Sequence, residues 1–275
     1  MPELPEVETI RRSLEEKIKG KTLIGVEVFL DKMLKGVGPR EANEALHGKK
    51  ITAIERRGKY LIIHLTGGKA MVIHLRMTGQ LLYCPSEQEK AKHTHVIFHL
   101  NDECQLRFAD QRQFGKVQLV SSRELKELSG LKTLGVEPLS DQFTRDLLRK
   151  ELRNRRTRIK PLLLDQTFVA GIGNIYADEA LFRATINPER IASTLNPREV
   201  SRLFLSVRKV LMEGIDNKGT SIRDYIDGDG NQGSNQNNLR VYGREGEPCV
   251  KCGQIIKRKS IGGRSSHFCP KCQKL

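Results

Sequence analysis

The chain has 275 residues and a mass of 31.2 kDa, which suggests about two domains, each large enough for its own core. Its 48 Lys and Arg exceed its 33 Asp and Glu to give a net charge of +15, so the expected partner is a polyanion, nucleic acid before membrane. Its apolar runs are only of strand length, which excludes a membrane span, and the acidic N-terminus lacks a signal peptide, so we expect a cytoplasmic protein with reduced thiols.

The first eight residues are MPELPEVE, with proline in second position. An initiator Met before a small residue is normally removed, so we expect Pro2 to present a free secondary amine beside three carboxylates. Such an amine attacks a sugar aldehyde to form a cationic iminium, and an α-amino group has a pKa of about 7.7–8.0. The same residues suit the first turn of a helix, and their apolar spacing predicts one over about 5–18. Judged alone, the segment favours this plainer interpretation.

Residues 22–121 predict a β-rich domain. Short runs of Val, Ile and Leu alternate there with Gly and Asn-Asp turns, which is typical of an antiparallel sandwich or barrel. The expected strands are 24–29, 51–54, 60–65, 70–75, 81–84, 95–100, 106–108 and 116–120.

The pattern becomes helical after a boundary that we place near residue 132. Helices are predicted over 141–154 and 174–184. A third is predicted from Asn196, which suits an N-cap because Pro and Glu follow at the first and third helical positions. The turn at 171–174 is either a plain helix start or a phosphate site made by free N–H groups.

Positive charge is concentrated in this second half. Residues 240–275 contain nine Lys or Arg and two Glu, a balance of +7. A second cluster has few acids near it, unlike an ordinary solvated helix face. We therefore expect phosphate contacts from this cluster, which consists of Arg149, Lys150, Arg153, Arg155, Arg156, Arg158 and Lys160.

Residues 227–238 contain no apolar side chain, so nothing in them can anchor to a core. We expect a mobile loop, which is either a linker or a lid over a pocket.

Four of the six cysteines form two CxxC pairs separated by sixteen residues. Two such pairs supply four thiolates to one tetrahedral zinc, whereas disulfides are disfavoured in a reducing compartment. Four sulfurs leave no position for water, so the predicted ion is structural. The expected ligands are Cys249, Cys252, Cys269 and Cys272.

Five motifs together resemble the formamidopyrimidine-DNA glycosylases. They are PELPEVET at 2–9, GKY at 58–60, HLRMTG at 74–79, GNIYA at 173–177 and the cysteine module. The resemblance covers essentially the whole chain. It implies a bifunctional glycosylase and AP lyase that removes oxidised purines, such as 8-oxoguanine and formamidopyrimidines, from double-stranded DNA.

The resemblance also implies an α+β architecture, a monomer and a bacterial cytosolic location. The expected domains are an N-terminal β-sandwich with a leading helix (1–132), a helix–two-turn–helix domain (133–226), a lesion-capture loop (227–239) and a zinc finger (240–275).

Catalytic roles follow from the same resemblance. Pro2 would attack C1′ as the nucleophile, Glu3 would be the general acid and base, and Lys59 would relay a proton during β-elimination. Arg264 would grip phosphate and assist δ-elimination. Glu6 and His74 would support the site.

Contacts with DNA are implied at further positions. An enzyme that extrudes a base must fill the gap that it leaves, and Met77 and Phe114 would be this wedge. Arg112 would bond the orphaned cytosine. The remaining expected contacts are His93, Arg156, Asn174 and Tyr242 to phosphate, and Ile222, Arg223, Asp224 and Tyr225 in the lesion loop. This chain has Asn235-Gln236 where an aromatic residue is expected before the Gln, which weakens the expected capture of the lesion.

Two other functions remain open from the sequence. A sister glycosylase for oxidised pyrimidines shares Pro2, Glu3 and the zinc finger, although Arg112 and Phe114 favour the purine enzyme. A zinc-ribbon protein that binds nucleic acid without catalysis needs the charge and the cysteines but no free N-terminal proline.

Overall fold

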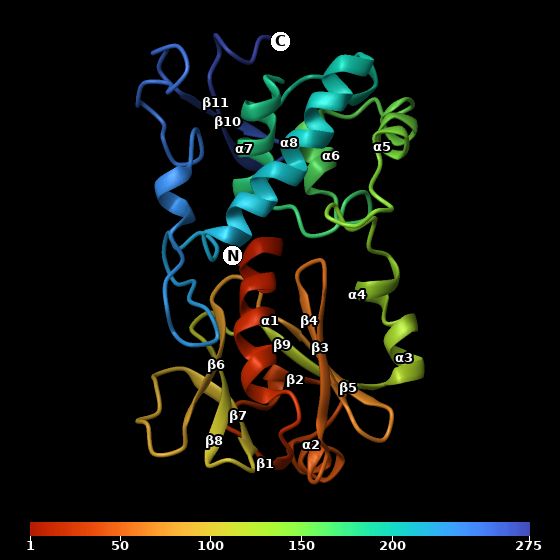
Figure 1. Cartoon of the computed structure of the whole chain (residues 1–275), viewed down its shortest axis with the longest axis vertical. Coiled ribbons are helices and arrows are strands. Elements are labelled where there is room, and N and C mark those ends of the chain that lie inside the picture. Colours follow the sequence, from red (N-terminus) through yellow and green to blue (C-terminus); the bar gives the residue numbers. More distant parts are fainter. The chain divides into compact units, whose positions relative to one another are not determined.

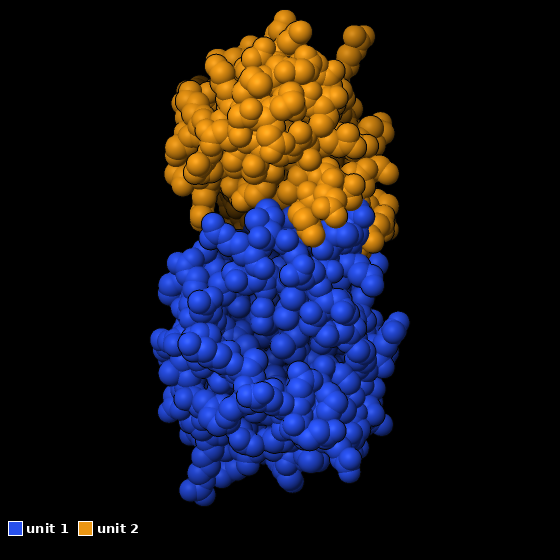
Figure 2. All heavy atoms as spheres, turned by 90° about the vertical axis from the view of Figure 1, so that its left-hand side faces the viewer, with its two compact units in different colours: residues 1–132, 217–234 blue, residues 133–216, 235–275 orange.

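The computed structural model describes all 275 residues, and they divide into two compact units (Figures 1 and 2). The first unit comprises 1–132 and 217–234, and the second comprises 133–216 and 235–275. Both units are therefore built from two separate stretches of chain. The helices are all too short or too polar to cross a membrane.

Two β-sheets and a leading helix, α1 (Leu4–Ile18), form most of the first unit. One sheet has the antiparallel order β1-β7-β8-β6; the other has the order β2-β9-β5-β4-β3, in which only the β2/β9 pair is parallel. The strands are β1 (Leu23–Val28), β2 (Leu34–Lys35), β3 (Ile51–Arg57), β4 (Tyr60–Leu65), β5 (Lys69–His74), β6 (Gly79–Pro85), β7 (Thr94–Leu100), β8 (Cys104–Asp110) and β9 (Lys116–Ser121).

Both sheets and α1 contribute to a single hydrophobic core. Ile10 and Leu14 of α1 are buried with Ile63 of one sheet and Phe98 and Phe108 of the other. The expected sandwich with a leading helix is confirmed, and each of the eight expected strands is present.

Four short helical elements of the first unit were not predicted. These elements are η1 (Asp31–Met33), α2 (Pro39–Leu46), α3 (Ser122–Glu127) and α4 (Ser129–Lys132). Two of them had a capping signal. Glu41 accepts the Gly38 N–H at 3.1 Å ahead of α2, and Ser121 and Glu124 form a capping box at the start of α3, with bonds of 2.7 and 3.2 Å. The others are too short to show a helical period.

Polar contacts hold the segment 217–234 within the first unit. The Gly228 carbonyl accepts the N–H of Tyr83 at 2.9 Å, and the Gly228 N–H donates to Ser13 Oγ at 3.1 Å. Asp227 Oδ1 accepts N–H groups of its own turn, and Tyr225 joins the hydrophobic core. The lack of apolar side chains over 227–238 has therefore not left this stretch without anchors.

The second unit consists of four helices and a β-hairpin. Asn196 Oδ1 accepts the N–H groups of residues 198 and 199 at 3.0 Å, so the expected N-cap is confirmed, and the helix over 174–184 is present as expected. The helix expected from 141 begins only after Thr144, whose hydroxyl caps it. The elements are α5 (Arg145–Leu152), α6 (Ile159–Leu164), α7 (Asn174–Ala184), η2 (Ala192–Thr194), α8 (Pro197–Asp216), η3 (Asn235–Asn238), β10 (Lys257–Ile261) and β11 (Arg264–Phe268).

Gly214 permits the close packing of α8 against α7. A Cβ at this position would lie 2.6 Å from the ring of Tyr176, which is fully buried on α7. We expect Gly214→Ala to lower the free energy of unfolding by about 1–3 kcal/mol, although Ala is the better helix former, because the ring cannot yield in a packed core. Thermal unfolding of the purified variant measures this.

The matched background is Tyr176→Leu, which removes the ring. There the same Gly214→Ala change should be neutral or stabilising. Equal destabilisation in both backgrounds would show that the contact with Tyr176 is not the reason for the glycine.

Candidate functional site

The carboxylate of Glu6 fixes the beginning of α1. Glu6 is 1 % exposed, and its Oε2 accepts the backbone N–H of Glu3, the N-cap residue, at 2.8 Å. Its Oε1 accepts the N–H of Thr220 at 2.8 Å. Pro2 is buried, and Glu3 is only 3 % exposed. One buried carboxylate thus joins the N-terminal segment to residue 220, two parts of the chain that lie far apart in sequence.

Tyr225 strengthens this junction. Its hydroxyl donates to the carbonyl of Lys218 at 3.1 Å, and the carbonyl of Glu6 lies 3.4 Å away. Burial, and the nearby Glu6 carboxylate, raise the pKa of Tyr225 far above its usual value. A Cβ at residue 219 would lie 2.7 Å from the Tyr225 ring, and its φ of +83° also favours glycine there. The tyrosine is thus a neutral structural contact.

Lys59 lies in the turn between β3 and β4 and is 7 % exposed. Arg56 spans this turn: its Nη1 donates to the carbonyl of Gly58 at 3.2 Å, and its Nε donates to Glu8 of α1 at 3.1 Å. Burial alone would raise the pKa of Glu8. The hydrogen bonds from Arg11 and Arg12 and the positive charges of Arg11 and Arg56 outweigh this effect and lower the pKa. The ionised carboxylate therefore holds the backbone next to Lys59.

His74 ends β5 as a neutral ring. Its Nδ1 accepts the N–H of Arg76 at 3.0 Å, and the ring packs edge-on against Tyr60, with centroids 4.5 Å apart. Burial lowers the pKa of His74 to about 3, and the charges of Arg76 and Lys59 add to the effect. His74 therefore carries no charge at neutral pH.

The expected wedge residues are both exposed, as several other large apolar side chains of the chain are. Met77 is 41 % and Phe114 is 52 % exposed. The guanidinium of Arg112 lies 5.2 Å from the centroid of the Phe114 ring. Neither side chain belongs to the hydrophobic core of the first unit.

Asp110, which the sequence did not single out, organises the turn that carries the wedge. Its carboxylate is 1 % exposed and accepts bonds from Thr78 Oγ1 at 2.5 Å, the Arg112 N–H at 3.2 Å and the Gly115 N–H at 2.7 Å. Its own N–H donates to the carbonyl of His93 at 3.0 Å. The available sequence signal was an Asp at the start of a polar turn, where its side chain can accept the N–H groups that follow.

The expected lesion-loop residues differ in exposure. Ile222 is 50 % exposed, Arg223 and Asp224 are exposed, and Tyr225 is buried. The carbonyl of Asp224 accepts the side-chain amide of Gln80 at 2.6 Å. The loop therefore presents three side chains outward from a fixed tyrosine.

In the second unit, the four predicted cysteines lie together. Their Sγ atoms lie within 4.8 Å of one another, and Cys252 lies 3.5 Å from Cys269 and 3.4 Å from Cys272. Four sulfurs about 2.3 Å from one tetrahedral zinc lie about 3.8 Å apart, so the cluster fits this ion. Burial raises the pKa of Cys272 to about 12, so holding all four as thiolates requires a cation.

Two adjacent acids of α7 bind the zinc module, and the sequence did not single them out. Glu179 accepts the N–H groups of three consecutive residues, 240, 241 and 242, at 2.9–3.0 Å. Asp178 Oδ2 accepts the His267 N–H at 2.9 Å, and its Oδ1 pairs with Lys160 Nζ at 2.7 Å. Lys160 also donates to the carbonyl of Ser265 at 2.6 Å. The backbone before each of the two cysteine pairs is thus hydrogen-bonded to α7.

Lys160 corrects one expectation. It was grouped with the basic cluster that should contact phosphate, but it is fully buried and neutralised by Asp178. An ammonium without exposed surface cannot meet a phosphate.

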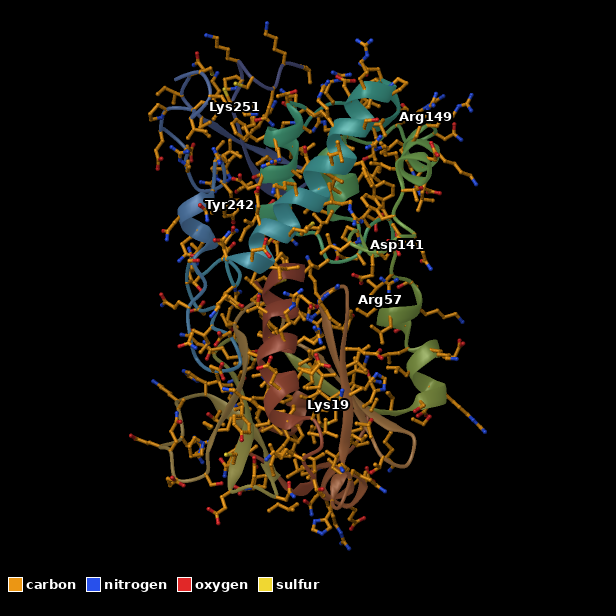
Figure 3. The ribbon with its side chains drawn as sticks, viewed as in Figure 1. Lys19, Arg57, Asp141, Arg149, Tyr242 and Lys251 are labelled. Atoms are coloured by element: carbon orange, nitrogen blue, oxygen red, sulfur yellow. The ribbon has the colours of Figure 1, made fainter.

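The remaining expected contacts of this unit are spread over several elements. Arg156 is exposed between α5 and α6, and Arg264 is exposed at the first position of β11. Asn174 begins α7 after Gly173, an N-cap with no side chain to occupy the free N–H groups. Tyr242 follows η3 (Figure 3), and its ring lies 5.0 Å from that of His267.

Asn235, the departure noted in the sequence, belongs to the second unit. It is 5 % exposed, and its side-chain amide lies 3.5 Å from the Tyr176 hydroxyl. The side chain of Asn235 is therefore buried next to Tyr176 of α7.

Comparison with known families gives three matches in chain order. Residues 1–117 match the formamidopyrimidine-DNA glycosylase N-terminal domain, and residues 134–225 match the H2TH domain of the same enzymes. Residues 246–275 match the zinc finger found in FPG and IleRS.

Relatives and solved structures agree with these matches. Formamidopyrimidine-DNA glycosylases of Pelotomaculum thermopropionicum and Desulforamulus reducens are 57 % and 52 % identical over the whole chain, covering 100 % and 99 % of those proteins. The structure is similar to a Lactococcus lactis FPG variant in complex with Fapy-dG DNA, with 39 % identity, a TM-score of 0.94 and full coverage of both chains. MutM in complex with carbocyclic 8-oxo-G DNA gives 40 % identity and a TM-score of 0.92, again over all of both chains. The chain belongs to the formamidopyrimidine-DNA glycosylase family.

Proposed function

We propose that this enzyme excises oxidised purines from duplex DNA and then cleaves the abasic strand through a Schiff base on Pro2. Its family membership over the whole length supports the glycosylase and lyase activity, and similar proteins have been solved with Fapy-dG and 8-oxo-G DNA. The observation that carries the proposal is the buried beginning of α1, where Glu3 and Glu6 lie next to a proline.

The first unit supplies the chemistry in this proposal. With Met1 removed, the Pro2 nitrogen attacks C1′ of the extruded nucleotide, and the damaged base leaves with the electrons of the glycosidic bond. The Pro2 nitrogen loses its proton, the C1′–O4′ bond opens to give the iminium, and Glu3, the adjacent carboxylate, moves the protons. The resulting iminium acidifies the C2′ hydrogens, so that the 3′ phosphate ester is lost first and the 5′ ester second. Lys59, whose turn is held by Arg56 and Glu8, relays a proton in the first elimination.

Met77 and Phe114 fill the space of the extruded base, with Arg112 facing the orphaned cytosine. Their exposure supports this role, because an exposed apolar side chain that inserts into a base stack leaves water and packs against the bases. His74 assists as a neutral hydrogen-bonding group, and His93 contacts phosphate.

The second unit binds phosphates of the DNA backbone in this proposal. Arg156, Asn174, Tyr242 and Arg264 are the proposed contacts, and Arg264 also assists the second elimination. The zinc ion and α7 fix the backbone that carries Tyr242 and Arg264. Double-stranded DNA with a damaged base is the proposed partner of a monomeric, cytosolic enzyme.

One similar structure, of the Lactococcus lactis FPG, holds DNA with an oxidised pyrimidine. This observation keeps a pyrimidine activity as a second candidate for the same site.

Substitution of the nucleophile tests the proposal. We expect Pro2→Gly to reduce borohydride trapping on an 8-oxoguanine:C duplex by at least about tenfold, because its primary amine gives an imine that can lose its N–H proton. Binding of the duplex should remain within about threefold. Gel analysis of the covalent adduct measures trapping, and intact mass spectrometry verifies that Met1 is absent.

Pro39→Gly is the control, since Pro39 also begins a helix of the first unit. Undiminished trapping by Pro2→Gly would place the nucleophile elsewhere. A thymine glycol duplex cleaved in preference to 8-oxoguanine:C would favour the pyrimidine activity.

Glu179 should control the backbone at Tyr242. Oε1 of Glu179 accepts all three N–H groups, and Oε2 also accepts that of Arg240. Gln would replace the charged acceptor with a neutral one and would place an NH₂ group in the position of one carboxylate oxygen, and each buried donor left without a partner costs about 1–3 kcal/mol. We expect Glu179→Gln to speed hydrogen exchange over 240–242 by about tenfold or more and to weaken binding of abasic duplex. Glu213→Gln, at an exposed acid on α8, is the control. Unchanged exchange in Glu179→Gln would contradict the role of this acid.

His74 gives the enzyme a dependence on pH. Its pKa is about 3 in the folded chain against 6.5 in an unfolded one, so protonation opposes folding. The stability that it contributes is complete above pH 6.5 and is lost as the pH falls toward 3. When the pH is lowered from 7.5 to 5.0, the free energy of unfolding should fall by about 2 kcal/mol more in the unsubstituted protein than in His74→Gln. Denaturant unfolding measures this difference. Equal losses would contradict a neutral, buried His74.

A further inference from the structure

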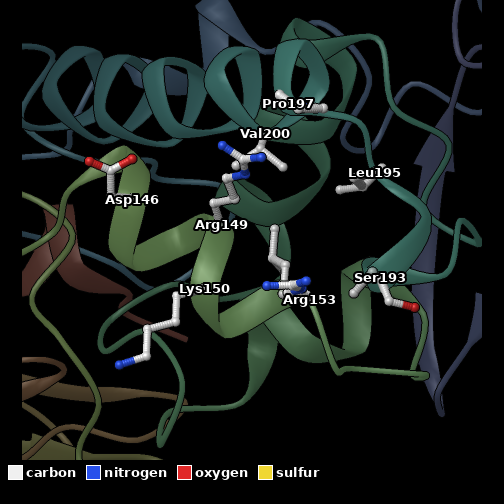
Figure 4. A pocket seen from close by; sticks show the side chains of 10 residues that line it. Asp146, Arg149, Lys150, Arg153, Ser193, Leu195, Pro197 and Val200 are labelled. Atoms are coloured by element: carbon white, nitrogen blue, oxygen red, sulfur yellow. The ribbon is translucent and has the colours of Figure 1, made fainter.

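A pocket of about 470 Å³ lies between α5 and the start of α8, within the second unit (Figure 4). Its floor is apolar: Leu152 is 2 % exposed, Ala192 is 1 % exposed and Val200 is 4 % exposed. Leu195 and Pro197 form one side. Three residues of the expected basic cluster line it, namely Arg149, Lys150 and Arg153, but the catalytic residues and the phosphate contacts named in the proposed function do not.

Three cations surround this floor, and all are exposed. Arg149, Lys150 and Arg153 come from the last turn of α5 and its C-cap. Figure 4 shows Arg149 and Arg153 extending toward Val200 and Ser193, while Lys150 points away from them. Figure 3 shows Arg149 on the outer side of α5.

These cations lack the partners that neighbouring cations have. Arg155 pairs with Glu151 at 3.8 Å, and Arg190 pairs with Glu199 at 3.3 Å. Arg149, Lys150 and Arg153 form no ion pair. Asp146 also lines the pocket, but Figure 4 shows its carboxylate well away from the ends of all three cations. The position of the cations at the C-terminus of α5 suits the helix dipole, but the dipole does not account for an apolar pocket between them.

The lining favours a peptide over nucleic acid. A phosphate backbone needs cations but no apolar floor, and a base stacks on aromatic side chains, of which the pocket has none. An aliphatic side chain fits the floor formed by Leu152 and Val200. Carboxylates on either side of it match the arginines by charge.

We propose that this pocket binds an acidic peptide segment of a partner protein, with one aliphatic side chain on the Leu152–Val200 floor and its acids on Arg149 and Arg153. The geometry would let the enzyme be recruited by another protein through a surface that carries none of the residues assigned to lesion excision.

The test uses the full-length enzyme and a fluorescein-labelled peptide in which one leucine is flanked on each side by three aspartates. Fluorescence anisotropy at low ionic strength compares it with the same peptide carrying serine for leucine. The leucine peptide should bind at least about tenfold more tightly, because burial of a Leu side chain contributes a factor of about 10–100. Arg149→Glu with Arg153→Glu should weaken its binding by at least about tenfold.

Arg123→Glu with Lys126→Glu is the matched control, since it makes the same change of charge on exposed α3. This control should weaken binding of the leucine peptide by less than about threefold. Ser193→Trp, which fills the pocket without changing charge, should remove the preference for leucine.

Three results would overturn the proposal. Equal binding of the two peptides, or equal loss of peptide binding in the two charge variants, would show only general electrostatic attraction. A much larger loss of undamaged duplex binding in the Arg149/Arg153 variant than in the control would make the pocket a phosphate contact. Circular dichroism verifies that each variant is folded.

Discussion

The enzyme depends on one buried carboxylate, that of Glu6. A charge with 1 % exposure is stable only if its oxygens are occupied by donors, and here they are occupied by the N–H groups of residues 3 and 220. The carboxylate therefore sets where the N-terminal segment lies and where the later segment begins. In the proposed mechanism the Pro2 nitrogen must meet one carbon of an extruded sugar, and the end of a chain has no preceding residue to orient it, so this anchoring of the segment matters there.

The same device recurs in both units. Asp110 gathers the turn of the wedge, Asp178 holds the β11 strand, and Glu179 holds three successive N–H groups before the first zinc cysteine. A chain with a net charge of +15 thus places some of its few acids inside, as anchors for irregular backbone. Most of its cations stay outside, where a polyanion can reach them. The division explains how so basic a protein still folds compactly.

Elements with a strong local pattern could be predicted from the sequence, and so could the zinc cysteines. The strands, α1, α7 and the Asn196 cap follow from periodicity and capping, which act over a few residues. The acids at 178 and 179 could not be predicted as anchors, because the backbone N–H groups that they accept lie 61–89 residues away and helical acids are usually solvated. For the same reason Lys160 was grouped with exposed cations. Composition also could not show that polar turns anchor the stretch after 227.

The first unit is closed by its own late segment, and this has a consequence for biosynthesis. Residues 217–234 carry Thr220 and Tyr225, so the ribosome must translate more than two hundred codons before Glu6 can meet its second donor. At about 5–20 residues per second, the nascent N-terminus waits for roughly 10–40 seconds. During that interval the first residue stays accessible to the aminopeptidase that trims new chains. Met1 is still 53 % exposed in the complete fold, so its removal can take place before or after the Thr220 N–H reaches Glu6.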